Sequence, residues 1–290
     1  MDFNSPSFKL NLNSLLGNKI GTINAEPVGG GCINDAFKLS TQSGVFFVKR
    51  NAAERIEMFE KEQRGLEAMR KTQTIPIARP IGTFVDNESA FLLMDWVDTA
   101  PKRPKFWSEF GESLAALHQT RYASYGWEED NYIGSLVQPN DFASSFVDFF
   151  ASQRLLPMLK LAMDADLVDN DFSKRCYQLI ERLPKLIPEA APSLLHGDLW
   201  SGNFLVGDKG QAVLIDPAVY YGHHEAELAF TRLFGGFDQE FYDGYAAVYP
   251  MQEGWKERID LFNLYPLMVH LNLFGQSYLP EIHRTMVKFT

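Results

Sequence analysis

The feature that most constrains the fold of this 290-residue chain is a change of pattern near residue 97. Before that point, alternating apolar runs bounded by turn residues predict strands, and one amphipathic stretch predicts a helix. The expected strands are 21–30, 35–41, 45–50, 78–86 and 89–98, and the expected helix is 53–71. Five short strands with one helix form a complete small α+β unit.

Helical periodicity dominates the rest of the chain. Helices are expected over 106–119, 145–165 and 171–186, and the only clear strands are 203–207 and 212–217. We therefore expect two lobes. The first, residues 1–97, contains a five-stranded antiparallel sheet with one helix, and the second, residues 98–290, is mainly helical.

Composition narrows the chemical class. With 46% hydrophobic and 22% charged residues, the chain has the make-up of a soluble globular protein. A net charge of −10 disfavours nucleic acid or an anionic membrane as the partner. We expect neither a membrane span nor a signal peptide, because no run is apolar enough and the start lacks a basic, then apolar, pattern. The two cysteines, Cys32 and Cys176, are too few for a disulfide framework. The lack of such a framework is typical of cytoplasmic proteins, and we expect this location.

The segment HGDLWSGN, residues 196–203, is the strongest chemical signal. His196, Asp198 and Asn203 have the spacing H-x-D-x-x-x-x-N of a phosphotransfer loop. In such a loop Asp198 accepts the proton of the attacking hydroxyl and Asn203 holds Mg²⁺. Asp216, near the end of the predicted strand at 212–217, supplies a second magnesium ligand. We expect His196 to fix the loop by hydrogen bonds.

A buried ion pair is predicted in the first lobe. Lys49 ends a predicted apolar strand, and taken alone it is better explained as a lysine whose aliphatic stem carries the amine to solvent. Glu62, however, lies on the apolar stripe of the predicted helix, where a carboxylate is costly unless paired. Lys49 is its natural partner and would contact nucleotide phosphates; Glu60 is the fallback if the helix is rotated.

The glycine-rich segment GGGCIN, residues 29–34, is ambiguous alone, since glycines between strands often form plain hairpins. Upstream of Lys49, the backbone N–H groups of Gly30, Gly31, Cys32 and Ile33 can contact phosphate oxygens. Cys32 is either a redox-active thiol or a bystander. An exposed Cys32 would permit a disulfide-linked dimer, so we expect a monomer or a weak dimer.

The stretch after Asp216 favours a small-molecule kinase over a protein kinase. A protein kinase has a long activation segment there, whereas DPAVYYGHHEAELAF leads directly into a predicted helix. Pro217 stiffens the position at which a protein kinase has a mobile phenylalanine.

Taken with these features, HGDLWSGN and DPAVYYGHHEAELAFTRLFGGF resemble the fructosamine/ketosamine-3-kinase family, within the aminoglycoside phosphotransferase-like branch of the kinase fold. MFEKEQRGLEAM, NYIGSLVQPN, FFASQRL and LFNLYPLMVHLNLFG also match, so the resemblance spans nearly the whole chain. It implies a two-lobed protein-kinase-like fold and phosphorylation, with ATP and Mg²⁺, of the 3-hydroxyl of a small-molecule or protein-bound ketosamine. A kinase for an aminoglycoside, choline or homoserine and a nucleotide-binding pseudokinase are the alternatives.

The resemblance also implies roles for further residues. MDWV, residues 94–97, matches the hinge that meets adenine, with Met94, Asp95 and Val97 as the contacts. Trp200 is either a packing anchor or a wall for the sugar, and His270 is either a core histidine or an acceptor contact. The acceptor candidates also include His223 and Glu225, in a GHHE stretch that departs from the usual family form.

Other polar residues are expected to have structural roles. A zinc site is disfavoured, because adjacent helical histidines point in different directions and no cysteine or third histidine is well spaced. Its candidate ligands would be His223, His224, Glu225 and Glu227. We expect Glu227 to cap or hydrogen-bond the catalytic region. His118 is expected to be a helix-end residue without a chemical role.

Overall fold

The computed structural model describes residues 2–29 and 33–290, and the chain forms two compact units. The first contains Met1–Phe106 and Gly202–Pro217, and the second contains Trp107–Ser201 and Ala218–Thr290. Three residues of the predicted phosphate loop, Gly30, Gly31 and Cys32, lie outside the described residues.

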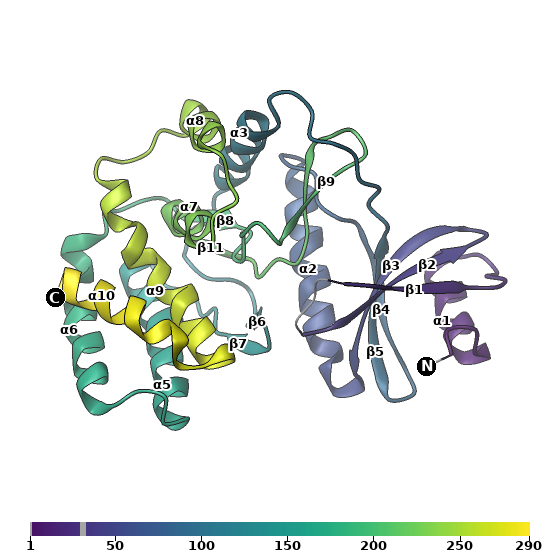
Figure 1. Ribbon diagram of the computed structural model, residues 1–290, viewed down its shortest axis with the longest axis horizontal. Coiled ribbons are helices and arrows are strands. Elements are labelled where there is room, and N and C mark those ends of the chain that lie inside the picture. The colour runs from purple at the N-terminus through teal and green to yellow at the C-terminus, as the bar shows by residue number, and fades with distance from the viewer. Residues whose placement is uncertain (1, 30–32) are drawn as a thin grey trace. The chain divides into compact units, whose positions relative to one another are not determined.

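A five-stranded antiparallel sheet forms the centre of the first unit (Figure 1). Its strands are β1 (Asn24–Val28), β2 (Asp35–Thr41), β3 (Gly44–Ala52), β4 (Pro80–Asp86) and β5 (Ser89–Asp95), in the order β1-β2-β3-β5-β4. All five predicted strands are confirmed. The predicted helix is also present, as the 3₁₀ turn η1 (Ala53–Arg55) followed by α2 (Ile56–Thr72).

The prediction of a single helix in this unit is wrong. An additional helix, α1 (Pro6–Leu16), begins at the N-cap Ser5, whose hydroxyl accepts from the Phe8 N–H. It ends at Gly17, which adopts φ 67°. Phe8 and Leu12 are fully buried with apolar side chains of the sheet, so α1 covers one face of it. The capping signals of α1 lie in the sequence, but the strand pattern that follows α1 led to the prediction of strands with a single helix.

A short hairpin from late in the sequence completes the first unit. It consists of β9 (Phe204–Val206) and β10 (Ala212–Leu214), close to the two predicted strands. Leu214 exchanges backbone hydrogen bonds with Pro76 and Ala78, and the Ala100 N–H donates to Val206. The hairpin therefore hydrogen-bonds to the segment before β4 and to the segment after β5, although both segments are far from the hairpin in sequence.

The second unit is mainly helical, as predicted. Its helices are α3 (Phe106–His118), α4 (Phe146–Phe149), the π-helical turn η2 (Phe150–Leu155), α5 (Leu156–Asp164), α6 (Asn170–Leu186), α7 (His224–Leu233), α8 (Gln239–Val248), α9 (Trp255–Phe274), the 3₁₀ turn η3 (Gln276–Tyr278) and α10 (Leu279–Phe289). Helix α9 is buried over most of its length and packs against α5, α7 and α10 (Figure 1). Among the described residues, no helix is both long and apolar enough to cross a bilayer.

Two details of the second unit differ from expectation. The helix expected over 145–165 is interrupted by η2, where Arg154 is fully buried with its guanidinium over the Tyr220 ring at 4.1 Å. Four short strands were not predicted, because three residues are too few to show periodicity. They are β6 (Asn131–Ile133), which pairs with β7 (Leu136–Gln138), and β8 (Ser193–Leu195), which pairs with β11 (Tyr220–Gly222).

Candidate active site

Lys49 is the centre of a buried charge cluster in the first unit. It lies on β3 between Ala36 and Leu92 of the neighbouring strands. Its Nζ atom is 2.7 Å from Glu62 Oε1 on α2 and 2.7 Å from Asp216 Oδ1, just beyond β10. The predicted pairing of Lys49 with Glu62 is confirmed, and Asp216 joins it as a second carboxylate.

The charges in this cluster depend on one another. Burial lowers the pKa of Lys49, but Asp216 and Glu62 outweigh it and raise this pKa overall, so the amine is cationic. Burial raises the pKa of Glu62 to about 6, with Lys49 opposing the shift and Asp216 adding to it. The cluster thus has one cation shared between two carboxylates, an arrangement that fixes the position of the amine.

The β9–β10 hairpin brings together the two predicted magnesium ligands. Phe204 pairs with Leu214, and the Ile215 N–H donates to the Asn203 carbonyl at 3.1 Å, so Asn203 and Asp216 extend from the same end of the hairpin. Asp216 adopts φ 56°, a left-handed conformation uncommon for a non-glycine residue. Its side chain is 39% exposed although Oδ1 meets Lys49.

These residues fit a magnesium ion. One carboxylate and one amide supply the hard oxygen donors that Mg²⁺ prefers, and magnesium sites in kinases take their other ligands from phosphates and water. The partial exposure of Asp216 leaves its carboxylate accessible to such ligands.

In the second unit, the backbone of the predicted catalytic loop is held tightly after β8. The Ala218 N–H donates to the His196 carbonyl at 2.9 Å. Gly197 has φ 83°, and a Cβ atom there would lie 2.0 Å from the Ala218 carbonyl oxygen, so only glycine fits. The His196 ring is fully buried, and its Nδ1 lies 3.3 Å from the Asp198 nitrogen as an acceptor. The prediction that His196 fixes the loop by hydrogen bonds is confirmed.

Glu227, on α7, anchors the same loop. Its Oε1 accepts the Gly197 N–H at 2.7 Å and its Oε2 accepts the His196 N–H at 3.1 Å, which confirms the expected hydrogen bonding to the catalytic region. Burial raises the pKa of Glu227, but the hydrogen bond and charge of His118 outweigh it and lower this pKa overall. Glu227 is therefore an ionised carboxylate, and both of its oxygens accept hydrogen bonds.

His118 is a helix-end residue, as expected, and its contacts are structural. It ends α3, is fully buried, and lies 2.8 Å from Glu227 Oε2 through Nε2 and 2.8 Å from the Tyr245 hydroxyl through Nδ1. Because the carboxylate only accepts, His118 donates from Nε2. The available signal was a histidine on the apolar face of a helix, which needs a buried partner; the partner itself is 109 residues away.

The hinge candidates lie where β5 ends. Met94 is buried within β5, and Asp95 is its last residue. The Asp95 N–H donates to the Arg79 carbonyl at 2.9 Å, and its carboxylate accepts two hydrogen bonds from the Arg79 guanidinium. Val97 follows the strand, and Ile33, also described, is exposed just before β2. The adenine and phosphate contacts of these residues stay predictions.

Two acceptor candidates are enclosed by protein. His223 is the N-cap of α7, and its Nδ1 accepts the Glu225 N–H. Glu225 is buried and accepts two 2.7 Å hydrogen bonds from Arg258. Their burial favours a supporting role over direct substrate contact, and substrate contact stays a prediction. Within the described ranges, no group of three or more His, Cys, Asp or Glu side chains is arranged to hold a metal.

The other two acceptor candidates reach the surface. Trp200, two residues after Asp198, is 37% exposed and contacts the Phe234 ring. His270, on α9, also contacts Phe234, at 4.8 Å between ring centroids. Aromatic contacts therefore connect the two in one surface region.

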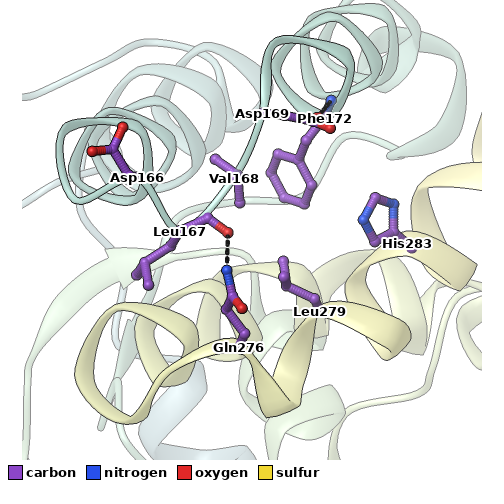
Figure 2. A pocket seen from close by; sticks show the side chains of 8 residues that line it. All are labelled: Asp166, Leu167, Val168, Asp169, Phe172, Gln276, Leu279 and His283. Carbon is purple, nitrogen blue, oxygen red and sulfur yellow. Dashed lines mark hydrogen bonds between the residues drawn. The ribbon is translucent and has the colours of Figure 1, made fainter.

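A cavity of about 320 Å³ lies elsewhere in the second unit, between the α5–α6 loop, η3 and α10. Figure 2 shows Phe172 and His283 on one side and Gln276 reaching Leu167 on the other. None of the cavity-lining residues belongs to the predicted site; they are Asp166, Leu167, Val168, Asp169, Phe172, Gln276, Leu279 and His283.

A family model described as fructosamine kinase matches residues 5–290 of the chain. The chain belongs to the fructosamine kinase family. A probable ketoamine kinase of Synechocystis sp. is 41% identical over 254 residues, covering 87% of this chain and 85% of the relative. A chloroplastic protein-ribulosamine 3-kinase of Arabidopsis thaliana is 39% identical, covering 87% and 78%. The predicted family is confirmed.

Solved structures agree with this membership. The crystal structure of a fructosamine-3-kinase homologue from Haemophilus somnus matches with a TM-score of 0.88 at 28% identity, covering 98% of this chain and 96% of that one. An aminoglycoside phosphotransferase, APH(4)-Ia, matches with a TM-score of 0.61 at 14% identity, which shows the fold alone. The predicted kinase-like fold is confirmed. As a member of the family, the protein is a phosphotransferase that acts on a hydroxyl group.

Proposed function

We propose that the protein transfers the terminal phosphoryl group of ATP to the 3-hydroxyl of a ketosamine, free or carried by a protein lysine. The observation that carries this proposal is the buried Lys49 amine, held at 2.7 Å by both Glu62 and Asp216. A cation fixed in this way binds phosphate oxygens without having to be ordered first. Family membership supports a ketosamine as the acceptor.

Asp198 is the proposed catalytic base. Phosphoryl transfer needs a carboxylate that orients the attacking hydroxyl and accepts its proton, and little other covalent chemistry from the protein. The loop backbone around Asp198 is immobilised by Glu227 and by the close contact of Gly197 with Ala218. A rigid backbone keeps the carboxylate in place from one turnover to the next.

The remaining proposed contacts surround the nucleotide. Backbone N–H groups at Gly30, Gly31, Cys32 and Ile33 would bind phosphate oxygens, and the backbone after Met94, at Asp95 and Val97, would bind adenine. Asn203 and Asp216 would hold Mg²⁺, which when bound neutralises charge on the phosphates. The fit of their oxygen donors to that ion supports the last assignment.

The test is release of ADP with Mg-ATP against fructosyl-lysine, ribulosyl-lysine, an aminoglycoside and choline. We expect turnover on a ketosamine, and Asp198→Asn should lower kcat at least about 100-fold because the base is lost. NMR of the product identifies the phosphorylated hydroxyl. Turnover only on the aminoglycoside or choline would refute the acceptor assignment, and a fully active Asp198→Asn variant would refute the base.

We propose that the protein acts in the cytoplasm, where ATP is supplied, as a monomer or a weak dimer. Cys176 is buried, and burial raises the pKa of its thiol to about 12, so it is a poor disulfide partner. A covalent dimer would have to use Cys32. A non-reducing gel of the wild type and of Cys32→Ser tests this, and a monomer in both lanes would exclude the covalent dimer.

A further inference from the structure

A continuous band of aromatic rings begins beside the catalytic loop. We call it the aromatic strip, and it consists of Trp200, Phe234, His270, Phe274 and Tyr278. Ring centroids are 6.3 Å apart from Trp200 to Phe234 and 4.8 Å from Phe234 to His270. From His270 they are 5.5 Å to Phe274 and 5.2 Å to Tyr278. The strip therefore connects the loop of Asp198 with the C-terminal end of α9 and with η3.

The rings of the strip are exposed together. Trp200 is 37%, Phe234 43% and Phe274 54% exposed, and Tyr278 and His270 are half-buried. Single exposed apolar side chains are common, but contiguous ones rimmed by polar residues mark binding surfaces. Trp200 lies two residues after Asp198. The other rings extend the surface past it.

His270 gives the strip a polar atom whose hydrogen-bonding role is defined. Its Nδ1 lies 2.7 Å from the Pro266 carbonyl oxygen, which can only accept, so Nδ1 carries the hydrogen. Burial lowers the pKa of His270, with the Pro266 hydrogen bond opposing the shift, so the ring is neutral at pH 7. Nε2 is then an acceptor for an N–H or O–H group.

The far end of the strip is anchored. Gln276, in η3 between Phe274 and Tyr278, donates from Nε2 to the Leu167 carbonyl at 3.0 Å, the contact drawn in Figure 2. This bond fixes η3 to the loop between α5 and α6. The rings at this end of the strip are therefore already held in place, so a ligand does not have to order them when it binds.

We infer that the aromatic strip binds the amine end of the acceptor and selects ketosamines whose amine carries an apolar or aromatic group. This inference rests on the proposed function. A ketosamine joins its sugar to a secondary amine that is protonated at neutral pH. Aromatic faces attract such a cation, and a neutral Nε2 on His270 accepts its N–H. Phe274 and Tyr278 then contact the group beyond the amine, and the strip contains no formally charged side chain that would favour a charged carrier.

Two adducts of the same sugar test this inference, one on ethylamine and one on phenethylamine. The measured quantity is the ratio of kcat/KM for the phenethylamine adduct to that for the ethylamine adduct. We expect a wild-type ratio of about 10, the gain from one aromatic ring contact. Phe274→Ala and Tyr278→Ala should each bring the ratio toward 1, and Tyr278→Phe should retain it. Phe142→Ala, which removes a ring that is 46% exposed elsewhere in this unit, should leave the ratio unchanged.

His270→Phe has a different signature. It removes the acceptor but keeps a ring, so kcat/KM should fall about tenfold for both adducts while their ratio stays the same. A wild-type ratio near 1, or equal ratios in the wild type and Phe274→Ala, would overturn the inference and leave the proposed function intact. If no ketosamine is phosphorylated, the proposed function fails instead. In that case calorimetry on the same variants gives the dissociation constants of the phenethylamine and ethylamine adducts, and the ratio of these two constants tests the inference in place of kcat/KM.

Discussion

Glu227→Gln is the substitution that best separates positioning of the catalytic loop from its chemistry. In the wild type, the Glu227 carboxylate accepts three hydrogen bonds, from the backbone N–H groups of His196 and Gly197 and from His118 Nε2. Glutamine has nearly the same shape but only one acceptor oxygen. Whichever way the amide is turned, its NH₂ group faces at least one backbone N–H of the loop.

The expected magnitude follows from that loss. A hydrogen bond to a charged group contributes about 1.5–3 kcal/mol, and one backbone N–H, that of buried His196 or of part-buried Gly197, is left without an acceptor. When this lost hydrogen-bond energy destabilises the active conformation of the loop, kcat drops about 10- to 100-fold, because each 1.4 kcal/mol corresponds to a factor of ten. A destabilisation of about 2 kcal/mol also lowers Tm by roughly 4–8 °C.

The assay is steady-state ADP release across a range of ATP and ketosamine concentrations, with Tm measured on the same preparations. We expect a lower kcat with KM for ATP nearly unchanged, because Glu227 has no contact with the Lys49 cluster among the hydrogen bonds of the described residues. Tyr245→Phe is the matched control. It removes only the bond to His118 Nδ1, so the effect on kcat should be under about threefold.

Wild-type kcat and Tm in Glu227→Gln would refute the reasoning, because the loop would then not depend on the carboxylate. A loss confined to Tm would show that Glu227 stabilises the fold without positioning Asp198.

Two further predictions concern charge. Glu62→Gln should raise KM for ATP about tenfold, because Lys49 loses one of its two carboxylate partners. Steady-state kinetics measure this KM, and Glu60→Gln is the control. Equal effects of the two substitutions would contradict the pairing of Lys49 with Glu62. The free energy of unfolding should fall as pH drops below about 6.5, because burial lowers the pKa of His223 to about 3 and of His224 to about 2, so the unfolded chain binds protons that the folded chain does not. At pH 5 each histidine costs about 2 kcal/mol, and urea unfolding of His224→Gln at pH 7.5 and pH 5 should show a smaller loss than the wild type.

Much of the candidate site was predictable because its signals are local in sequence. His196, Asp198 and Asn203 lie within eight residues, and that spacing implies phosphotransfer chemistry wherever the loop lies. Glu62 was predictable as the partner of Lys49 for a different reason. A carboxylate on an apolar helical stripe requires a cation, and the chain has a lysine at the end of an adjacent strand.

The sequence by itself determined the family, the five strands, the helix α2 and the residue types of the phosphotransfer loop, since each depends on short-range periodicity or spacing. Only the tertiary structure decided which distant groups satisfy the buried polar atoms. His118 and Glu227 meet across 109 residues, and Asp216 meets Lys49 across 167. The aromatic strip likewise joins side chains from the catalytic loop, the C-cap of α7, α9 and η3. Such contacts have no period along the chain, because they follow from burial: a polar or charged group removed from water takes as its partner whichever group the packing brings near.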